Sequence, residues 1–308
     1  MKPKGESERS LPPGVPEPKD YAAVVAASLL WGTSFPAMAL VLGTQQVDPF
    51  LLTAVRLGLA AVLSLAVLAA LRRLRPSVFT NKWVWILGAL NALAFTLQHV
   101  GVGLNHSAAK TALIVNVNLA FVALLSVRMF GERLTSGRVV AVVFALLGLT
   151  ALTTKIDPAF FTQQEFRGDL FIFLSSVVWT PYILYTKVAV KEHDPIDLVA
   201  GLLAVTALLL VPTLALADYS AQVPTAGWWV IAWLGLAVTF PPVLLYTFSL
   251  KRVSATTVTV LTLIEVLFGS FLGFLLIGET FVAAQVLGAV LLLVGIVLAV
   301  SSENAARK

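Results

Sequence analysis

The sequence predicts an all-α membrane protein in which ten transmembrane helices form two inverted five-helix repeats. Three observations predict this class: the composition is strongly apolar, segments of membrane-spanning length follow one another, and landmark residues recur at a constant offset. The chain has 308 residues, of which 58% are hydrophobic and 12% charged, and its mean hydropathy is +0.92. A soluble domain carries about twice this charged fraction. A cytosolic enzyme, a disordered chain and a secreted mini-protein are therefore excluded.

Ten apolar segments of about 18–24 residues alternate with short polar breaks. This is the length needed to cross about 30 Å of hydrocarbon at about 1.5 Å per residue. Backbone amides find no water partners at that depth, so we expect each segment to be a helix. The predicted spans, numbered 1 to 10 in chain order, are 21–43, 49–71, 83–104, 107–130, 136–153, 169–190, 196–217, 227–249, 255–277 and 280–301.

The placement of basic residues predicts the topology. If the N-terminus is cytoplasmic, the cytoplasmic segments hold 17 of the 21 Lys and Arg residues and the outer segments hold 3, while Arg56 lies within a span. Basic loops resist translocation, so we expect a multi-pass plasma-membrane protein with both termini in the cytoplasm. The predicted organisation is a disordered tail (1–20), a first five-helix repeat (21–153), an extracytoplasmic linker (154–168), a second five-helix repeat (169–301) and a cytoplasmic tail (302–308).

Three landmarks recur with nearly the same offset. Trp31 recurs as Trp179 after 148 residues, Asp48-Pro49 as Asp194-Pro195 after 146, and Gly131-Glu132 as Gly278-Glu279 after 147. The repeated unit therefore holds five spans. Because five is odd, the second copy enters the membrane from the opposite side. Inverted repeats of this kind are typical of secondary transporters, in which two halves expose a central site alternately.

These landmarks resemble a known family. Trp31-Gly32-Thr33-Ser34-Phe35, Arg56, Gly131-Glu132 and Gly278-Glu279 together resemble the pattern of EamA-type transporters in the drug/metabolite transporter superfamily, over about residues 21–301. The resemblance implies movement of small organic solutes, often the export of amino acids; relatives in the wider superfamily carry nucleotide sugars or phosphorylated sugars. The family usually has proline thirteen residues before each Gly-Glu glutamate. Leu119 and Val266 stand there, so we expect both helices to be straighter than usual.

A polar stripe follows one face of span 3. Its members are spaced by four, three, four and three residues: Asn91, Phe95, Gln98, Val102 and Asn105. His99 borders the stripe and is a candidate protonation switch. Two interpretations stay open, namely hydrogen bonding between helices and the wall of a solute cavity. We select Asn91, Gln98 and His99 as candidate substrate-binding residues.

Aromatic side chains inside the spans form a second group of candidates. Trp31 and Trp179 lie about ten residues inside their spans, deeper than the interfacial positions that tryptophan usually takes. Tyr182 lies on the same helical face as Trp179, and Tyr246 is the repeat counterpart of His99. We expect these four residues to line the pocket, where aromatic walls stack on a flat or cationic solute.

Two charged residues lie at membrane depth. Glu265, near the middle of span 9, is expected to bind substrate, as the counter-ion of an amine, or to carry a coupling proton; a structural acid is the alternative. Its repeat counterpart is Asn118, and Asn116, two residues away, is expected to face elsewhere. Arg56 is predicted to be structural, with carboxylate binding as the alternative.

Proline and glutamate positions complete the candidates. Pro36 and Pro181 follow the two equivalent tryptophans and are candidate hinges. Glu132 and Glu279 precede spans 5 and 10, where a carboxylate favours the positive N-terminal end of a helix, so we assign them a structural role.

The motifs favour a secondary carrier over the other classes of protein. The chain has no Cys, and it lacks a Walker A loop, HExxH, GxSxG and a dinucleotide fingerprint. We therefore expect no enzymatic activity, cofactor, metal site or nucleic-acid partner. The expected partners are a small-molecule solute, the lipid bilayer and a coupling proton. A passive solute channel and an exchanger of phosphorylated or nucleotide sugars remain the alternatives.

The topology predicts the location of two reporters. A reporter fused after residue 160 should lie outside the cytoplasm and one at 193 inside it, because span 6 separates them. Alkaline phosphatase and fluorescent-protein fusions measure the two locations. Fusions that report the same side would exclude both span 6 and the inverted repeat.

Overall fold

The computed structural model describes residues 15–44, 47–105, 107–132, 135–161, 166–219, 223–277 and 282–305. Within these ranges the chain forms helices and no strand, and ten helical segments are long and apolar enough to cross a membrane. The predicted all-α class and the predicted number of spans are confirmed. The observed segments end within four residues of the predicted positions.

Each repeat contributes five spans, some of them built from more than one helix. Spans 1 to 5 are α1 (Pro18–Gly32) with α2 (Ser34–Met38) and the π-helix η1 (Ala39–Thr44); α3 (Pro49–Ala70); α5 (Lys82–Asn105); α6 (Ala108–Val115) with α7 (Asn118–Phe130); and α8 (Ser136–Thr154). Spans 6 to 10 are α9 (Phe166–Glu192); α10 (Pro195–Leu210) with η3 (Val211–Leu216); α11 (Thr225–Leu236) with α12 (Phe240–Leu250); α13 (Ala255–Thr262) with α14 (Ile264–Ile277); and α15 (Ala283–Ala305). Short helices α4 (Pro76–Phe79) and η2 (Pro158–Phe161) lie in connections.

Helical structure extends into the segments that we assigned to the tails and the linker. Helix α1 starts at Pro18, α9 starts at Phe166 and α15 continues to Ala305. At the first of these positions, Glu17 and Asp20 cap the helix reciprocally, and the Glu17 backbone N–H donates to Asp20 Oδ2 at 2.7 Å. This capping box places the start of α1 ahead of its apolar residues.

The repeated Asp-Pro landmark is a helix-start signal in both repeats. Asp48 caps α3 by accepting from the backbone N–H groups of Phe50 and Leu51, and Asp194 caps α10 by accepting from Ile196. The proline that follows each aspartate takes the first helical position, where a missing N–H costs nothing. The local sequence thus fixes where spans 2 and 7 begin.

Gly131 ends α7 in a way that only glycine adopts without strain. Its φ is +65°, in the left-handed region, and its N–H donates to the carbonyl of Val127. Glu132, the next residue, therefore lies outside α7. The counterpart pair Gly278-Glu279 lies outside the described residues.

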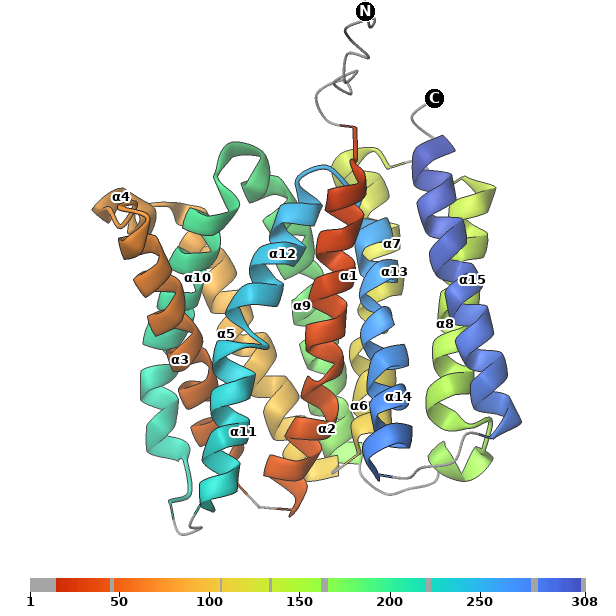
Figure 1. The fold of residues 1–308 in the computed structure, drawn as a ribbon, viewed down its shortest axis with the longest axis horizontal. Coiled ribbons are helices and arrows are strands. Elements are labelled where there is room, and N and C mark those ends of the chain that lie inside the picture. Colours follow the sequence, from red (N-terminus) through yellow and green to blue (C-terminus); the bar gives the residue numbers. More distant parts are fainter. Residues whose placement is uncertain are drawn as a thin grey trace, which may run out of the picture.

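The packing of the helices follows an approximate two-fold symmetry between the repeats. Three pairs of counterpart spans pack against each other: spans 5 and 10 through α8 and α15, spans 2 and 7 through α3 and α10, and spans 4 and 9 through α7 and α13. Other contacts occur in exchanged pairs: α5 packs on α9 as α12 packs on α1, and α5 on α10 as α11 on α3. Figure 1 shows the start of α1 and the end of α15 at the same end of the bundle, with α8 and α15 side by side at one flank. We call this end, where α1 begins and α15 ends, the termini end.

Helices α8 and α15 approach each other through glycine. A Cβ at Gly148 would lie 2.5 Å from the backbone nitrogen of Leu292, and one at its repeat counterpart Gly295 would lie 2.8 Å from that of Ala145. Lipid is as apolar as leucine, so close backbone packing replaces the hydrophobic effect as the force between these helices.

Adding a methyl group at this contact should destabilise the protein. We expect Gly148→Ala to lower the free energy of unfolding by about 1–3 kcal/mol, because the new Cβ collides with backbone that cannot yield. Gly103→Ala is the matched control, since its Cβ would approach only Pro49, at 3.7 Å. Thermal unfolding in detergent measures both variants, and equal losses would contradict the packing argument.

Candidate functional site

Four spans are interrupted partway along their length. The interruptions lie between α1 and α2, α6 and α7, α11 and α12, and α13 and α14. The second and fourth occupy equivalent positions, because Asn116 and Leu263 are 147 residues apart. The expectation that spans 4 and 9 are straighter than usual is therefore wrong. Both are broken a few residues before the positions where the family usually has proline.

A polar side chain satisfies the backbone at each interruption. Asn116 Nδ2 donates to the carbonyl of Ala112, while its own backbone N–H turns to Ile114. Thr hydroxyls bond the preceding turn in the other three spans: Thr33 to Leu30, Thr239 to Leu234 and Thr262 to Thr259. Local bonds of this type compete with the helix ladder. They explain how a helix breaks in lipid without leaving its carbonyls unpaired.

The interrupted helices surround one central cavity of about 120 Å³. Its wall draws on both repeats: Trp31 and Ser34 come from span 1, Asn116 and Asn118 from span 4, Tyr246 from span 8, and Thr259, Thr262 and Glu265 from span 9. Of the predicted substrate-binding residues, Trp31, Gln98, Trp179, Tyr182, Tyr246 and Glu265 all line this cavity. The structure thus brings together side chains that are up to 234 residues apart in the sequence.

Aromatic rings form two groups on the cavity wall. Trp31 packs on Tyr246 with ring centroids 5.5 Å apart. Trp179 meets Tyr182 and Phe95 edge-on, each at 5.1 Å, and its indole N–H donates to Gln98 Oε1 at 3.1 Å. Edge-on packing leaves ring faces available to a solute. Faces of Trp and Tyr attract cations and flat groups.

Glu265 supplies the cavity with a carboxyl group. It lies in the first turn of α14, and its Oε1 accepts from Asn116 Nδ2 at 3.4 Å. No cation pairs with it among the described residues. Asn116 was expected to face away from Asn118, because each residue of a regular helix turns by about 100°. Both residues nevertheless line the cavity. The reason is that the chain is not a regular helix between them, where α6 ends and α7 begins.

Arg56 supplies a guanidinium group held only by neutral partners. It was predicted to be structural, but it lines the cavity and is 2% exposed. Its Nε donates to Thr239 Oγ1 at 3.0 Å, its Nη1 contacts Met38 Sδ and His99, and its Cζ lies 4.9 Å above the Phe95 ring. No carboxylate pairs with it within the described part of the chain. The sequence signal that could have placed it in the site is its charge at membrane depth.

Two predicted binding residues lie behind the wall. Asn91 is fully buried between α5 and α10, where its Oδ1 accepts from Thr206 Oγ1 at 3.3 Å. His99 is also fully buried and contacts Arg56 and Thr53. The polar stripe of span 3 therefore divides: Phe95 and Gln98 line the cavity, whereas Asn105 donates to Asp169 Oδ1 at 3.1 Å near the end of the bundle opposite the termini.

The candidate hinges and Glu132 are not among the residues that line the cavity. Pro36 belongs to α2, directly after the first interruption, and Pro181 lies inside uninterrupted α9. Glu132 was assigned to the start of span 5, but its carboxylate binds the start of α13 instead: Oε1 accepts from the Ala255 N–H and Oε2 from the Thr256 hydroxyl, both at 2.9 Å. Glu279 lies outside the described residues.

A membrane-spanning bundle of two inverted five-helix repeats, with broken helices around a polar cavity, has the architecture of a membrane transporter. The chain belongs to the EamA-like transporter family, whose family model matches residues 19–154 and 166–301. The protein is therefore a membrane transporter of this family.

Comparison with individual proteins gives the same class. The chain is similar to the "Uncharacterized transporter YoaV" of Bacillus subtilis, with 23% identity over 90% of this chain and 95% of the relative. An "Uncharacterized transporter" of Archaeoglobus fulgidus is 22% identical over 92% of this chain and 99% of its own length. A crystal structure titled "Crystal structure of protein" matches the fold with a TM-score of 0.77 at 21% identity, covering 92% of this chain and 98% of the other.

Proposed function

We propose that this protein is a secondary transporter that moves a zwitterionic, amino-acid-like solute across the plasma membrane by alternating access. The observation that carries the proposal is that a guanidinium group, of Arg56 in the first repeat, and a carboxyl group, of Glu265 in the second, line one cavity while each bonds only neutral partners among the described residues. A solute with a carboxylate and an amine supplies a partner to each. The family resemblance favours export as the direction, and the basic segments favour cytoplasmic termini.

Each charged group has its own recognition chemistry. The guanidinium of Arg56 binds carboxylates through charge-assisted hydrogen bonds. Glu265 lies in the same cavity as the aromatic rings of Trp31 and Tyr246, and a carboxylate beside ring faces suits an ammonium group. Isolated charges are costly at this depth, so each ion of the solute offsets a desolvation cost that the empty site carries.

The solute proposal predicts a pattern of binding. Thermal unfolding of the detergent-solubilised protein should shift upward with at least one of the twenty L-amino acids, and less with its carboxamide or its decarboxylated amine. Arg56→Gln should weaken the amino acid roughly 10–100-fold, the loss expected for a charged hydrogen bond, and Glu265→Gln should do the same. Thr150→Val is the matched control, because Thr150 is exposed and its hydroxyl bonds only within α8, to the Leu146 carbonyl.

The outcomes separate the roles of Glu265. Binding that survives in Glu265→Gln, with loss of proton-driven accumulation in proteoliposomes, would assign this residue to proton coupling instead of amine binding. Unchanged binding and transport would leave it a structural acid. Preloaded unlabelled solute should accelerate uptake of labelled solute, since a carrier returns faster when loaded; absence of this counterflow would favour a passive channel.

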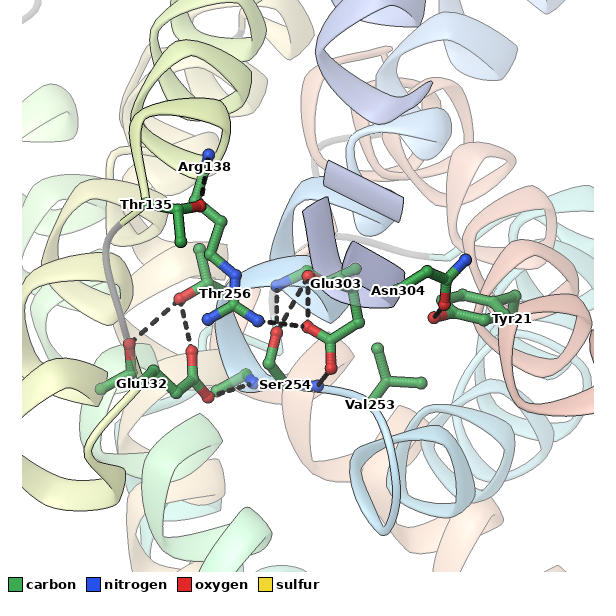
Figure 2. A network of polar contacts seen from close by, with 12 residues as sticks. Tyr21, Glu132, Thr135, Arg138, Val253, Ser254, Thr256, Glu303 and Asn304 are labelled. Carbon is green, nitrogen blue, oxygen red and sulfur yellow. Dashed lines mark hydrogen bonds and ion pairs between the residues drawn. The ribbon is translucent and has the colours of Figure 1, made fainter. Parts of the chain in front are cut away.

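Alternating access requires that one route to the cavity is closed, and a polar network joins the repeats at the termini end. We call this network the termini-end cluster; Figure 2 labels its members Glu132, Arg138, Ser254, Thr256 and Glu303. Thr257 belongs to it through its hydrogen bond to Glu303. Glu303 is fully buried, receives Arg138 Nη2 at 2.7 Å, and accepts from the Ser254 N–H and the Thr257 hydroxyl. Two carboxylates thus hold the first turn of α13.

Further contacts cross between the repeats beside this cluster. The Ser126 and Thr256 hydroxyls meet at 3.0 Å, and Tyr21 donates to Asn304 Oδ1 at 3.1 Å. Arg252 bridges the start of α1 through Glu17, at 2.9 Å. These bonds support the proposal that the termini-end cluster closes the cavity on this side.

Accessibility of a single cysteine tests this closure, because the chain has no Cys of its own. Thr259→Cys, on the cavity wall, should react with a membrane-impermeant thiol reagent from the side opposite the termini. Adding Glu132→Ala should raise its reaction rate from the termini side about fivefold or more, since each hydrogen bond lost is worth about 1 kcal/mol. Glu192→Ala, which removes an exposed glutamate near the same end, is the control. Equal rates in the two backgrounds would show that the cluster does not close the pathway.

A further inference from the structure

The guanidinium of Arg56 is anchored at one side and free at the other. Arginine has five N–H bonds, one on Nε and two on each terminal nitrogen. Thr239 accepts from Nε, and His99 Nε2 (at 3.2 Å) and Met38 Sδ (at 3.6 Å) take the two on Nη1. Nη2 has no hydrogen-bond partner among the described residues. Since Arg56 lines the cavity, Nη2 is the part of the guanidinium that remains for a solute.

The contact with His99 fixes where the histidine carries its proton. A guanidinium has no acceptor atom, so His99 Nε2 must accept from Arg56 Nη1. On the other side of the ring, Nδ1 lies 2.7 Å from Thr53 Oγ1. The single hydroxyl proton of Thr53 goes to the Pro49 carbonyl, at 2.5 Å, so Nδ1 must donate to Thr53. Two independent partners therefore require the same neutral tautomer, with hydrogen on Nδ1 and a lone pair on Nε2.

The chain of hydrogen bonds from the Pro49 carbonyl through Thr53 and His99 to Arg56, which we call the relay, joins helices α3 and α5. Thr53 and Arg56 are one turn apart on α3, and His99 on α5 bridges them. All three side chains are at most 2% exposed. The Pro49 carbonyl, in the first turn of α3, sets the direction of the whole chain of bonds.

We propose that His99, held by Thr53 as the neutral tautomer with hydrogen on Nδ1, is a positioning residue that presents the Nη2 group of Arg56 to a carboxylate in the cavity. His99 does not touch the solute; it acts through Arg56. The proposal rests on the proposed function in one respect, namely that the solute carries a carboxylate. It accounts for a histidine that lies behind the cavity wall instead of on it.

The first arm of the test needs no solute. In protein labelled with ¹⁵N-histidine and placed in nanodiscs at pH 7, the His99 signal is assigned by its loss in His99→Gln, which separates it from His106 and His193. We expect the shifts of a neutral ring with hydrogen on Nδ1. A ring with hydrogen on Nε2, or on both nitrogens, would overturn the proposal.

The second arm uses the twenty L-amino acids and their carboxamides as probes. His99→Leu removes the acceptor and should raise the Kd of the bound amino acid about tenfold, with little change for the carboxamide. His99→Gln offers an oxygen to Arg56 and should lose less. Thr53→Val should raise the Kd of the amino acid several-fold, whereas Thr96→Val, which removes a bond inside α5, should not.

The two arms distinguish failure of this proposal from failure of the proposed function. Equal losses for the amino acid and its carboxamide in His99→Leu, or equal losses in His99→Leu and His99→Gln, would make His99 a packing residue only. If no L-amino acid binds the wild-type protein, the proposed solute class is wrong, and the histidine signal alone decides whether the relay exists.

Discussion

A backbone inside a membrane has no water to bond, so a helix can be interrupted there only where the protein itself satisfies the free carbonyl and amide groups. This constraint organises the whole molecule. Four spans are broken, each break is sealed by an Asn or Thr side chain, and the breaks surround the central cavity that the four spans line. Elsewhere the spans remain continuous or nearly so. The cavity therefore lies where side-chain hydrogen bonds replace the regular backbone hydrogen bonds of the helices.

The constant offset between landmarks predicted the architecture because those landmarks are physical signals. Asp-Pro starts both α3 and α10, and Gly131 at positive φ ends α7, so these landmarks mark helix boundaries. The lengths of the spans could also be predicted from the sequence, since the thickness of the hydrocarbon core sets them. Side-chain periodicity served less well. Depth within the span selected Trp31 and Trp179, and periodicity placed Tyr182 beside Trp179; all three line the cavity. Periodicity assumed an unbroken helix, however, and so it misplaced Asn116, whose helix ends at Val115.

Other features depend on partners that no local pattern reveals. The charge of Arg56 was visible in the sequence, but that its partners are a threonine, a histidine and a methionine was not. Glu132 likewise precedes span 5 in the chain and yet caps α13, which lies 123 residues further on. Contacts between repeats arise from the two-fold packing of the bundle. They become predictable only once the pairing of α7 with α13 and of α8 with α15 is known.

The two repeats form a nearly symmetric scaffold around an asymmetric site. Trp31 and Trp179 are counterparts, as are His99 and Tyr246, whereas the counterpart of Glu265 is Asn118 and that of Arg56, at the Asp-Pro offset, is Leu202. Symmetry suits a scaffold that must open to either side of the membrane, because the two inverted repeats exchange conformations between the inward-open and the outward-open state. The proposed zwitterionic solute has distinct ends, so a site that binds it in one orientation must break that symmetry. The single guanidinium and the single carboxyl do so.

Helix α13 connects the proposed site with the termini-end cluster. Its first turn is held by Glu132 and Glu303, and one residue after its last turn α14 begins with Glu265 in its own first turn. From Thr256 to Glu265 is nine residues, or roughly 14 Å along a helix. The break at Leu263 lies between them, and Gly32 packs there so closely that a Cβ would lie 2.8 Å from the Glu265 carbonyl. If the proposed solute draws Glu265 toward its amine, it pulls on the junction of α13, α14 and α1. The other ends of α13 and α1 carry the bonds between the repeats. In the proposed mechanism, this short path couples occupation of the cavity to the bonds that hold the termini end closed.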